Sequence, residues 1–266
     1  MHLSQAHVTP KDAAPILAVE IEGPLAILTM NRPEKRNAMC DALLDAIDAF
    51  FARPPQGVRV VILTGTAGHF CSGLDLSEHV ARDAEGTMRH SRNWHRVMDL
   101  VQFSGLPVVS AMFGAVIGGG LELAASTHVR IAEPSTIFQL PEGRRGIYVG
   151  GGASVRIGRI LGSDRMCEMM LTGRKYGAEE ALALGLAHYA VGEGEAMSLA
   201  RELALKIAEN AQLSNFMMIQ AISRISDMSR SDGLFTESLA AAVSQTSADA
   251  QEGLRAFLEK RKPEFR

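Results

Sequence analysis

Short apolar runs and amphipathic stretches alternate along the first part of the chain. Two β-like runs, Ile16–Ile21 and Leu25–Met30, flank residues 22–24 (Glu-Gly-Pro), which suit a hairpin turn. In Ala38–Phe51 the apolar positions recur at helical spacing, and the β-branched run Val58–Leu63 is typical of a buried strand. The pattern therefore predicts a strand, strand, helix, strand unit.

The pattern then changes from mixed to mostly helical. Val108–Met112, His128–Ala132 and Thr136–Leu140 have strand character, and a helix is expected at Leu121–Ser126. From Gly152 onward the apolar spacing is mostly helical. There is no Ser/Gly-rich linker and no fixed-period repeat. We expect three segments: a flexible N-terminal arm at 1–15, a core domain at 16–200 and a C-terminal helical region at 201–266.

Composition narrows the class of protein. Of the 266 residues, 47% are hydrophobic and 21% are charged, which is typical of a globular protein with a substantial core. Lys and Arg number 27 against 30 Asp and Glu, and the formal net charge of -3 gives no basis for binding nucleic acid or an anionic membrane. No segment approaches the roughly 20 apolar residues of a membrane span.

The positions of the cysteines and histidines argue against a disulfide framework and against a metal site. The 3 cysteines are too few and too scattered for a disulfide framework, and no basic stretch precedes an apolar segment at the N-terminus. We therefore expect a reduced, cytoplasmic setting. His90 and His95 flank Trp94 on an expected helix, which favours surface or packing roles. We expect no metal site.

Three elements carry candidate chemistry. The loop His69–Asp75 follows a strand, and its small residues either form a tight turn or point N–H groups outward to bind an oxyanion. Gly118–Gly120 opens a helix, and Glu122 in its first turn either complements the helix dipole or is a half-buried functional acid. The glycine spacing does not fit a dinucleotide fingerprint. Glu142 lies just after the end of an expected strand, where its carboxylate either takes part in catalysis or pairs with a nearby arginine.

Together these elements resemble the crotonase family, the enoyl-CoA hydratases and isomerases. The resemblance implies a crotonase (ClpP-like) α/β fold of repeated ββα units, with a C-terminal helical region used in trimer contacts. It covers nearly the whole chain. The segments that carry it are Met30–Ala38, Leu63–Thr66, Phe70–Asp75, Gly118–Leu123, Leu140–Glu142, Leu171–Gly173, Ala181–Leu186 and Phe257–Lys262.

The resemblance implies a coenzyme A thioester as ligand, which is part of the substrate, and no separate cofactor. Backbone N–H groups of Ser72 and Gly119 would clamp the thioester carbonyl, and Arg36 would lie along the same ligand. The pantetheine and adenine end would be lined by Ser72, Gly73, Leu74 and Asp75. By the same resemblance the assembly is a homotrimer or a dimer of trimers.

Two glutamates mark the hydratases of this family, and they match Glu122 and Glu142; isomerases usually keep only the second. The presence of both favours hydration of a trans-2-enoyl-CoA to a 3-hydroxyacyl-CoA. The alternatives are a Δ3,Δ2-enoyl-CoA isomerase using Glu142 and a non-catalytic acyl-CoA-binding homologue. Two carboxyls that share one water do not both ionise easily in an apolar pocket, so we expect one raised pKa. We assign Glu142 as the acid and Glu122 as the group that activates water.

Departures from the family pattern concern several positions. His128 stands where the family commonly has Asp, which affects a structural contact. Arg144 and Arg145 either lower the pKa of Glu142 or face solvent or a neighbouring subunit. Tyr148 either reaches the acyl pocket or packs in the core. The sequence leaves the acyl group and its pathway open.

Overall fold

The computed structural model describes residues 14–77 and 81–265, so the expected arm at 1–15 lies almost entirely outside the described residues. A six-stranded sheet forms the centre, in the order β1-β2-β3-β4-β6-β8, and β5 pairs with β7 separately. β1 runs antiparallel to β2, and the other neighbours pair in parallel. The strands are β1 (Leu17–Glu22), β2 (Leu25–Met30), β3 (Val60–Gly65), β4 (Val108–Met112), β5 (Ala115–Ile117), β6 (Val129–Ala132), β7 (Ile137–Gln139) and β8 (Tyr189–Ala190).

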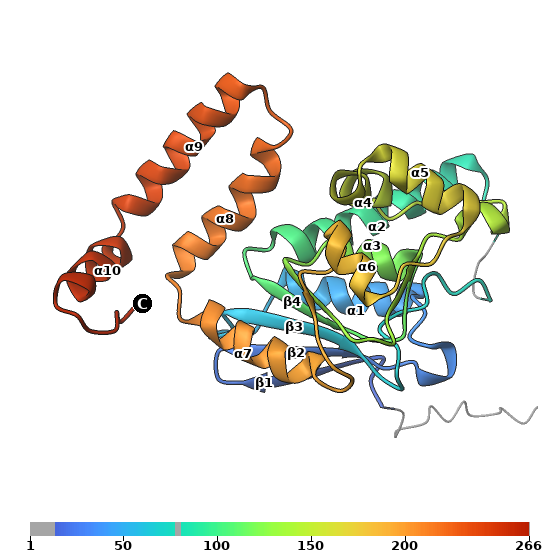
Figure 1. The fold of residues 1–266 in the computed structure, drawn as a ribbon, viewed down its shortest axis with the longest axis horizontal. Helices are drawn as coiled ribbons and strands as arrows, with labels where there is room; N and C mark the ends of the chain where they lie inside the picture. Colours follow the sequence, from blue (N-terminus) through green and yellow to red (C-terminus); the bar gives the residue numbers. More distant parts are fainter. Residues whose placement is uncertain (1–13, 78–80, 266) are drawn as a thin grey trace, which may run out of the picture.

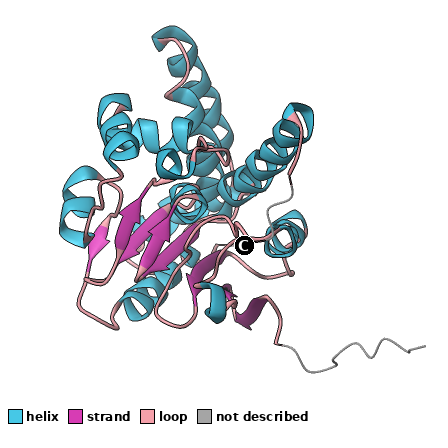
Figure 2. Cartoon of the chain, turned by 90° about the vertical axis from the view of Figure 1, so that its right-hand side faces the viewer, coloured by secondary structure: helices cyan, strands magenta, loops and turns pink. Residues whose placement is uncertain are grey.

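Helices cover both faces of this sheet (Figures 1 and 2). They are α1 (Asp41–Ala52), α2 (Ala84–Phe103), α3 (Gly119–Ala125), α4 (Ala153–Leu161), α5 (Ser163–Thr172), α6 (Ala178–Leu184), α7 (Ala196–Ala208), α8 (Gln212–Ile225), α9 (Arg230–Gln245) and α10 (Ala248–Leu258). Two 3₁₀ turns, η1 (Pro33–Lys35) and η2 (Glu142–Arg145), interrupt the loops. The chain is therefore a layered α/β structure, as its pattern predicts.

Side chains alternate between two cores along the central strands. In β2, Leu28 belongs to the larger core shared with α1, α2 and α3, whereas Ile27 belongs to a smaller core against α7. α7 covers its face of the sheet with a stripe of small residues, Ala196, Ala200, Ala204 and Ala208. The expected boundary at residue 200 divides this helix. Because α7 packs on the sheet, the core extends to Ala208.

The last three helices form a limb that projects from the core (Figure 1). α8 meets α2 where Gln220 donates a hydrogen bond to the Phe103 carbonyl at 2.6 Å and Arg224 lies 4.1 Å from the centre of the Phe103 ring. Several apolar side chains of the limb remain exposed, among them Met218, Ile222, Phe235, Leu239 and Phe257. We name α8–α10 the C-terminal limb.

Most of the expected elements are confirmed, with differences at their ends. The hairpin and β4 occupy the expected places, and the chain after Gly152 is mostly helical, as expected. α1 begins at Asp41 rather than Ala38, because Met39 forms a parallel bridge to Leu74 and Cys40 after it is extended. The short strands β5 and β8 were not expected from the pattern.

His128, the position at which the sequence departs from the expected pattern, is half-buried and bridges two elements. Its Nδ1 accepts the Val108 N–H at 2.9 Å, and its Nε2 lies 3.0 Å from the Gln102 carbonyl oxygen, to which it donates. Burial lowers the pKa of this imidazole to about 4, and the nearby Arg130 charge acts in the same direction. The fold therefore holds His128 in its neutral form.

Acid is expected to destabilise the fold through this histidine. Its folded pKa lies below the unfolded value of 6.5, so the contribution is present above pH 6.5 and is lost as pH falls toward 4, by at most about 3 kcal/mol. Urea unfolding at a series of pH values measures the loss. In His128→Gln the unfolding free energy should fall less between pH 6.5 and pH 4, and an unchanged fall would contradict this assignment.

Candidate active site

A cavity of about 290 Å³ lies where α2, α3 and η2 meet. Its walls include Leu74 from the loop after β3, Trp94 from α2, and Gly119 and Glu122 from α3. Glu142 from η2 completes them, so the two predicted catalytic carboxyls share one cavity with one predicted N–H donor. The segment 147–151 forms another wall.

The Glu122 carboxylate is anchored to the turn that begins α4. It is 4% exposed, and its Oε1 accepts the N–H groups of Gly151 at 2.8 Å and Ala153 at 3.0 Å. Burial raises the pKa of Glu122, while these N–H groups and the Arg156 charge act against that rise. The second carboxylate oxygen, Oε2, accepts neither of these two bonds.

Glu142 differs from Glu122 in having little polar support. It is 7% exposed, and its Oε2 is buried without a hydrogen-bond partner among the described residues. Burial raises the pKa of Glu142 to about 7, the Glu122 charge adds to the rise, and Arg145 opposes it. Burial therefore raises the pKa of both carboxyls, where one raised pKa was expected, and Glu142 is partly protonated near neutral pH.

The backbone donors differ in part from the prediction. The Ser72 N–H already donates to the Arg36 carbonyl at 3.0 Å, and the Ser72 hydroxyl donates to the Lys35 carbonyl at 2.9 Å. The Leu74 nitrogen instead lies 3.5 Å from the position that a Cβ on Gly119 would occupy. Across residues 14–77 and 81–265, neither the Leu74 N–H nor the Gly119 N–H has a protein acceptor. The prediction of Ser72 as the free donor is therefore wrong, and Leu74 and Gly119 supply the unused pair.

A second groove adjoins this cavity and holds several of the predicted binding residues. It has a volume of about 360 Å³ and shares Leu74, Leu76 and Arg145 with the cavity. Its other lining residues include Glu34, Lys35, Arg36, Ser72, Asp75 and Ser77. The cations Lys35, Arg36 and Arg145 give this groove a basic side suited to phosphate groups.

Gly73 and Asp75 shape the loop. Asp75 is buried and forms an ion pair with Arg32 at 2.8 Å, so its carboxylate holds the loop to the segment between β2 and η1. Gly73 has φ +97°, and a Cβ there would lie 2.7 Å from the Ile117 carbonyl oxygen. Both residues position the Leu74 N–H.

The structure also places the two arginines and the tyrosine that follow Glu142. Arg144 and Arg145 are exposed, and Arg144 donates to the Thr172 carbonyl, which supports the alternative of solvent-facing arginines. The other alternative holds for Arg145, whose charge lowers the pKa of Glu142. Tyr148 is 70% exposed and lines the cavity, so the core-packing alternative is wrong.

Cys71 is buried, which raises its thiol pKa to about 12 and disfavours a thiolate.

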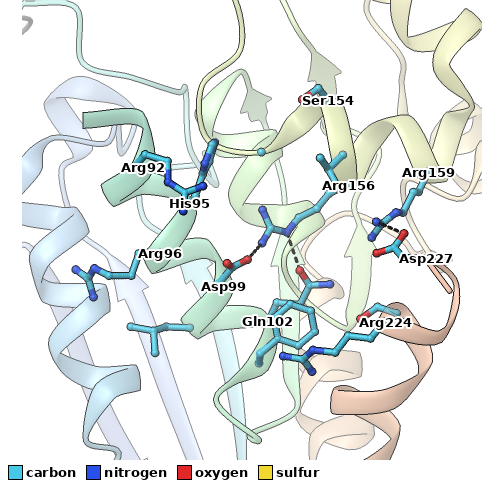
Figure 3. Close-up of a pocket in the computed structure, with 15 residues that line it drawn as sticks. Arg92, His95, Arg96, Asp99, Gln102, Ser154, Arg156, Arg159, Arg224 and Asp227 are labelled. Atoms are coloured by element: carbon cyan, nitrogen blue, oxygen red, sulfur yellow. Dashed lines mark hydrogen bonds and ion pairs between the residues drawn. The ribbon is translucent and has the colours of Figure 1, made fainter. Parts of the chain in front are cut away.

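A larger cavity, of about 780 Å³, lies between α2, α4 and α8 (Figure 3). It contains neither glutamate. Most of its basic side chains are already engaged within the protein, since Arg156 pairs with Asp99, Arg159 pairs with Asp227 and Arg96 pairs with Asp48. Figure 3 shows Arg156 pointing toward Asp99 and Gln102.

Comparison with known proteins decides the family. The enoyl-CoA hydratase/isomerase family model matches residues 20–266. The chain belongs to the enoyl-CoA hydratase/isomerase family. Over 259 residues it is 32% identical to an enoyl-CoA hydratase of Mycobacterium tuberculosis, covering 96% of this chain and 97% of the relative. It is 32% identical to a short-chain-enoyl-CoA hydratase of Clostridium acetobutylicum over 249 residues, or 92% and 95% of the two chains.

Solved structures agree with this family and confirm the crotonase fold. A Rhodopseudomonas palustris protein matches with a TM-score of 0.90 and 45% identity, over 95% of this chain and 98% of that one. The enoyl-CoA hydratase of Bacillus anthracis matches with a TM-score of 0.88 and 31% identity, over 94% and 98%. In this hydratase/isomerase family member, no helix of the described part is long and apolar enough to span a membrane. The same residues hold no group of three or more His, Cys, Asp or Glu arranged to bind a metal.

Sequence reasoning missed three contributors to the site of this family member. Leu74 was expected only as a lining residue, and Trp94 was assigned no role of its own. The backbone of Gly151 and Ala153 was not expected to hold Glu122. The second glycine run, residues 150–152, was the available signal, because a Cβ on Gly151 would lie 2.6 Å from Glu122 Oε2.

Proposed function

We propose that this protein adds water to a trans-2-enoyl-CoA and forms the 3-hydroxyacyl-CoA. The observation that carries the proposal is that two buried carboxyls, Glu122 and Glu142, share a cavity with the unused N–H groups of Leu74 and Gly119. Hydration needs a group that takes a proton from water, a group that protonates the α-carbon, and donors for the developing thioester enolate. This arrangement supplies each of them.

In the proposed step, Glu122 accepts a proton as the water oxygen bonds to the β-carbon. The electrons of the double bond move toward the thioester oxygen, where the Leu74 and Gly119 N–H groups stabilise the negative charge. Glu142 then delivers its proton to the α-carbon, and the product contains one added water. Proton exchange between the two carboxyls or with solvent restores the starting state.

The pH profile tests the role of Glu142. As an acid it must hold its proton, so kcat/KM is expected to fall as pH rises through its pKa of about 7. The Arg145 charge lowers this pKa, so Arg145→Gln should move the falling limb to higher pH. Arg144→Gln, at the neighbouring exposed position, is the matched control and should leave the limb in place. Movement of the limb to lower pH in Arg145→Gln would contradict the assignment.

Self-association is the second part of the proposal. The exposed apolar side chains of the C-terminal limb support a homotrimer or a dimer of trimers, in which neighbouring subunits cover them. Light scattering of the purified protein measures the assembly.

The three cysteines, Cys40, Cys71 and Cys167, are free thiols, which supports the cytoplasmic location that we propose.

An isomerase is the second candidate function, and the unpartnered Glu142 Oε2 favours it. A single carboxyl at that place can take a proton from one side of a 3-enoyl chain and return it to another carbon. A non-catalytic acyl-CoA binder is the third candidate, and it predicts binding without turnover.

The deciding experiment is incubation of the purified protein with enoyl-CoAs of short, long, branched and aryl chains. Loss of the conjugated thioester absorbance together with a product heavier by one water would establish hydration. Turnover of 3-enoyl-CoA alone would favour the isomerase. Binding of the thioesters without any turnover would overturn both enzymatic proposals.

A further inference from the structure

The turn that anchors Glu122 contains three glycines, residues 150–152, and neighbouring elements hold it in place. Such a turn has little side-chain packing of its own, because glycine has no Cβ and restricts the backbone least of all residues. Yet it must place the Gly151 and Ala153 N–H groups on one carboxylate oxygen, at 2.8 and 3.0 Å. Its shape therefore depends on neighbouring elements.

α2 provides one set of restraints along this turn. Ser91 donates a hydrogen bond from its hydroxyl to the Gly150 carbonyl at 2.6 Å. One turn further along α2, the Trp94 ring would lie 3.0 Å from a Cβ on Gly151. These contacts fix the start and the middle of the turn on the cavity side.

Arg156 provides the remaining restraint from the far side. Its guanidinium Nη1 lies over Gly152 and 3.5 Å from the Gly151 carbonyl oxygen. Its Nη2 donates to Asp99 at 2.5 Å and its Nε donates to the Gln102 side chain at 2.7 Å, so the planar group is fixed to α2 in two places (Figure 3).

We propose that Arg156 is a positioning residue for Glu122, which fastens the start of α4 to Asp99 and Gln102 and so fixes the turn that donates to the carboxylate. Arg156 does not line the 290 Å³ cavity and lines the larger cavity behind it. This inference rests on the proposed function, in which Glu122 activates water.

Charge is the second way in which Arg156 acts on Glu122. The charged or titratable groups that face the cavity with this carboxyl are Glu142, His90, Arg145 and Tyr148. Arg156 lies behind the turn, with Asp99 and His95 of α2 beside it. Arg156 favours the ionised form of Glu122, so its removal should raise the pKa of that carboxyl. A base needs its ionised form, and the rising acid limb of the rate profile should therefore move to higher pH.

The test compares Arg156→Gln with Arg159→Gln, which lies on the same helix, lines the same larger cavity and pairs with Asp227 instead. In Arg156→Gln, kcat is expected to fall by about 10–100-fold with KM within about twofold, because a shift of about 1 Å at a reacting group can cost 10²-fold. Hydrogen exchange of peptides covering residues 150–156 should become faster. Arg159→Gln should match the wild type in all three measurements.

Arg156→Lys separates charge from geometry. Lysine keeps the positive charge but lacks the planar group that binds Asp99 and Gln102 together. The acid limb should stay at its wild-type pH, while kcat falls part of the way and the 150–156 peptides exchange faster. If Arg156→Gln fails to fold, Asp99→Asn is the replacement variant. It removes the same Arg156–Asp99 ion pair by changing a carboxylate that is largely exposed. Its kcat and exchange should change in the same directions.

Wild-type exchange of residues 150–156 in Arg156→Gln, or in Asp99→Asn if the first does not fold, would overturn the inference. An increase in KM with unchanged kcat would overturn it as well. If the wild-type protein hydrates no enoyl-CoA, the proposed function fails, and the hydrogen-exchange comparison with Arg159→Gln still decides whether Arg156 holds the turn.

Discussion

Replacing Glu122 with glutamine is expected to reduce hydration by about 10²–10⁴-fold, the usual contribution of a positioned acid or base. The oxygen of the introduced amide can still accept the Gly151 and Ala153 N–H groups, so the variant should fold as the wild type does. An amide, however, takes no proton from water. Steady-state rates on the best enoyl-CoA of the panel measure the loss, and circular dichroism checks the fold.

The matched variant Glu142→Gln separates the two enzymatic candidates. If the protein is a hydratase, both variants lose hydration. If it is an isomerase, Glu122→Gln should keep most of the activity on 3-enoyl-CoA, whereas Glu142→Gln should lose it. Full hydration by Glu122→Gln would remove Glu122 from the mechanism that we propose.

Gly73→Ala is expected to have the second largest effect, because it disturbs a donor without touching a carboxyl. An alanine at φ +97° is strained, and its Cβ would lie 2.7 Å from the Ile117 carbonyl oxygen and 3.4 Å from the Gly119 nitrogen. The loop must move, and the Leu74 N–H moves with it. Loss of one oxyanion donor typically costs about 10²–10³-fold in kcat, and the backbone strain costs about 1–3 kcal/mol of stability.

Gly68→Ala is the control for strain alone. Gly68 has φ +74° in an exposed part of the same loop, and nothing lies within 4 Å of a Cβ there. This variant should lose some stability in urea unfolding but keep its kcat. Equal losses of kcat in the two variants would show that the loop acts through general stability and would argue against a donor at Leu74.

The sequence pattern predicts the fold well where one physical signal dominates. The β-branched runs and the Gly-containing turns place the hairpin and β4, because buried strands and turns have strong local preferences. The start of α1 could not be predicted in this way. Met39 favours no particular structure locally, and its bridge to Leu74 depends on a loop that lies 35 residues later in the chain.

The site was predictable to the extent that its chemistry depends on side chains. Glu122 and Glu142 are recognisable from their types and from the motifs around them, and they do share a cavity. The backbone donors are less accessible to sequence reasoning, since every residue except proline has an N–H. Which of these groups is left unused depends on the partners that the loop finds, and here Arg36 takes the Ser72 N–H and leaves that of Leu74.

The site is assembled from segments that are widely separated along the chain, at residues 74, 94, 119–122, 142 and 151–153. Contacts of such long sequence separation form late in folding, because a chain must close large loops before it gains them. During refolding from urea, helical circular dichroism should therefore return before activity does. The recovery of enzymatic activity then follows the final packing of α2, α3 and α4 against one another. Circular dichroism, which follows only the formation of the helices, does not detect this last step.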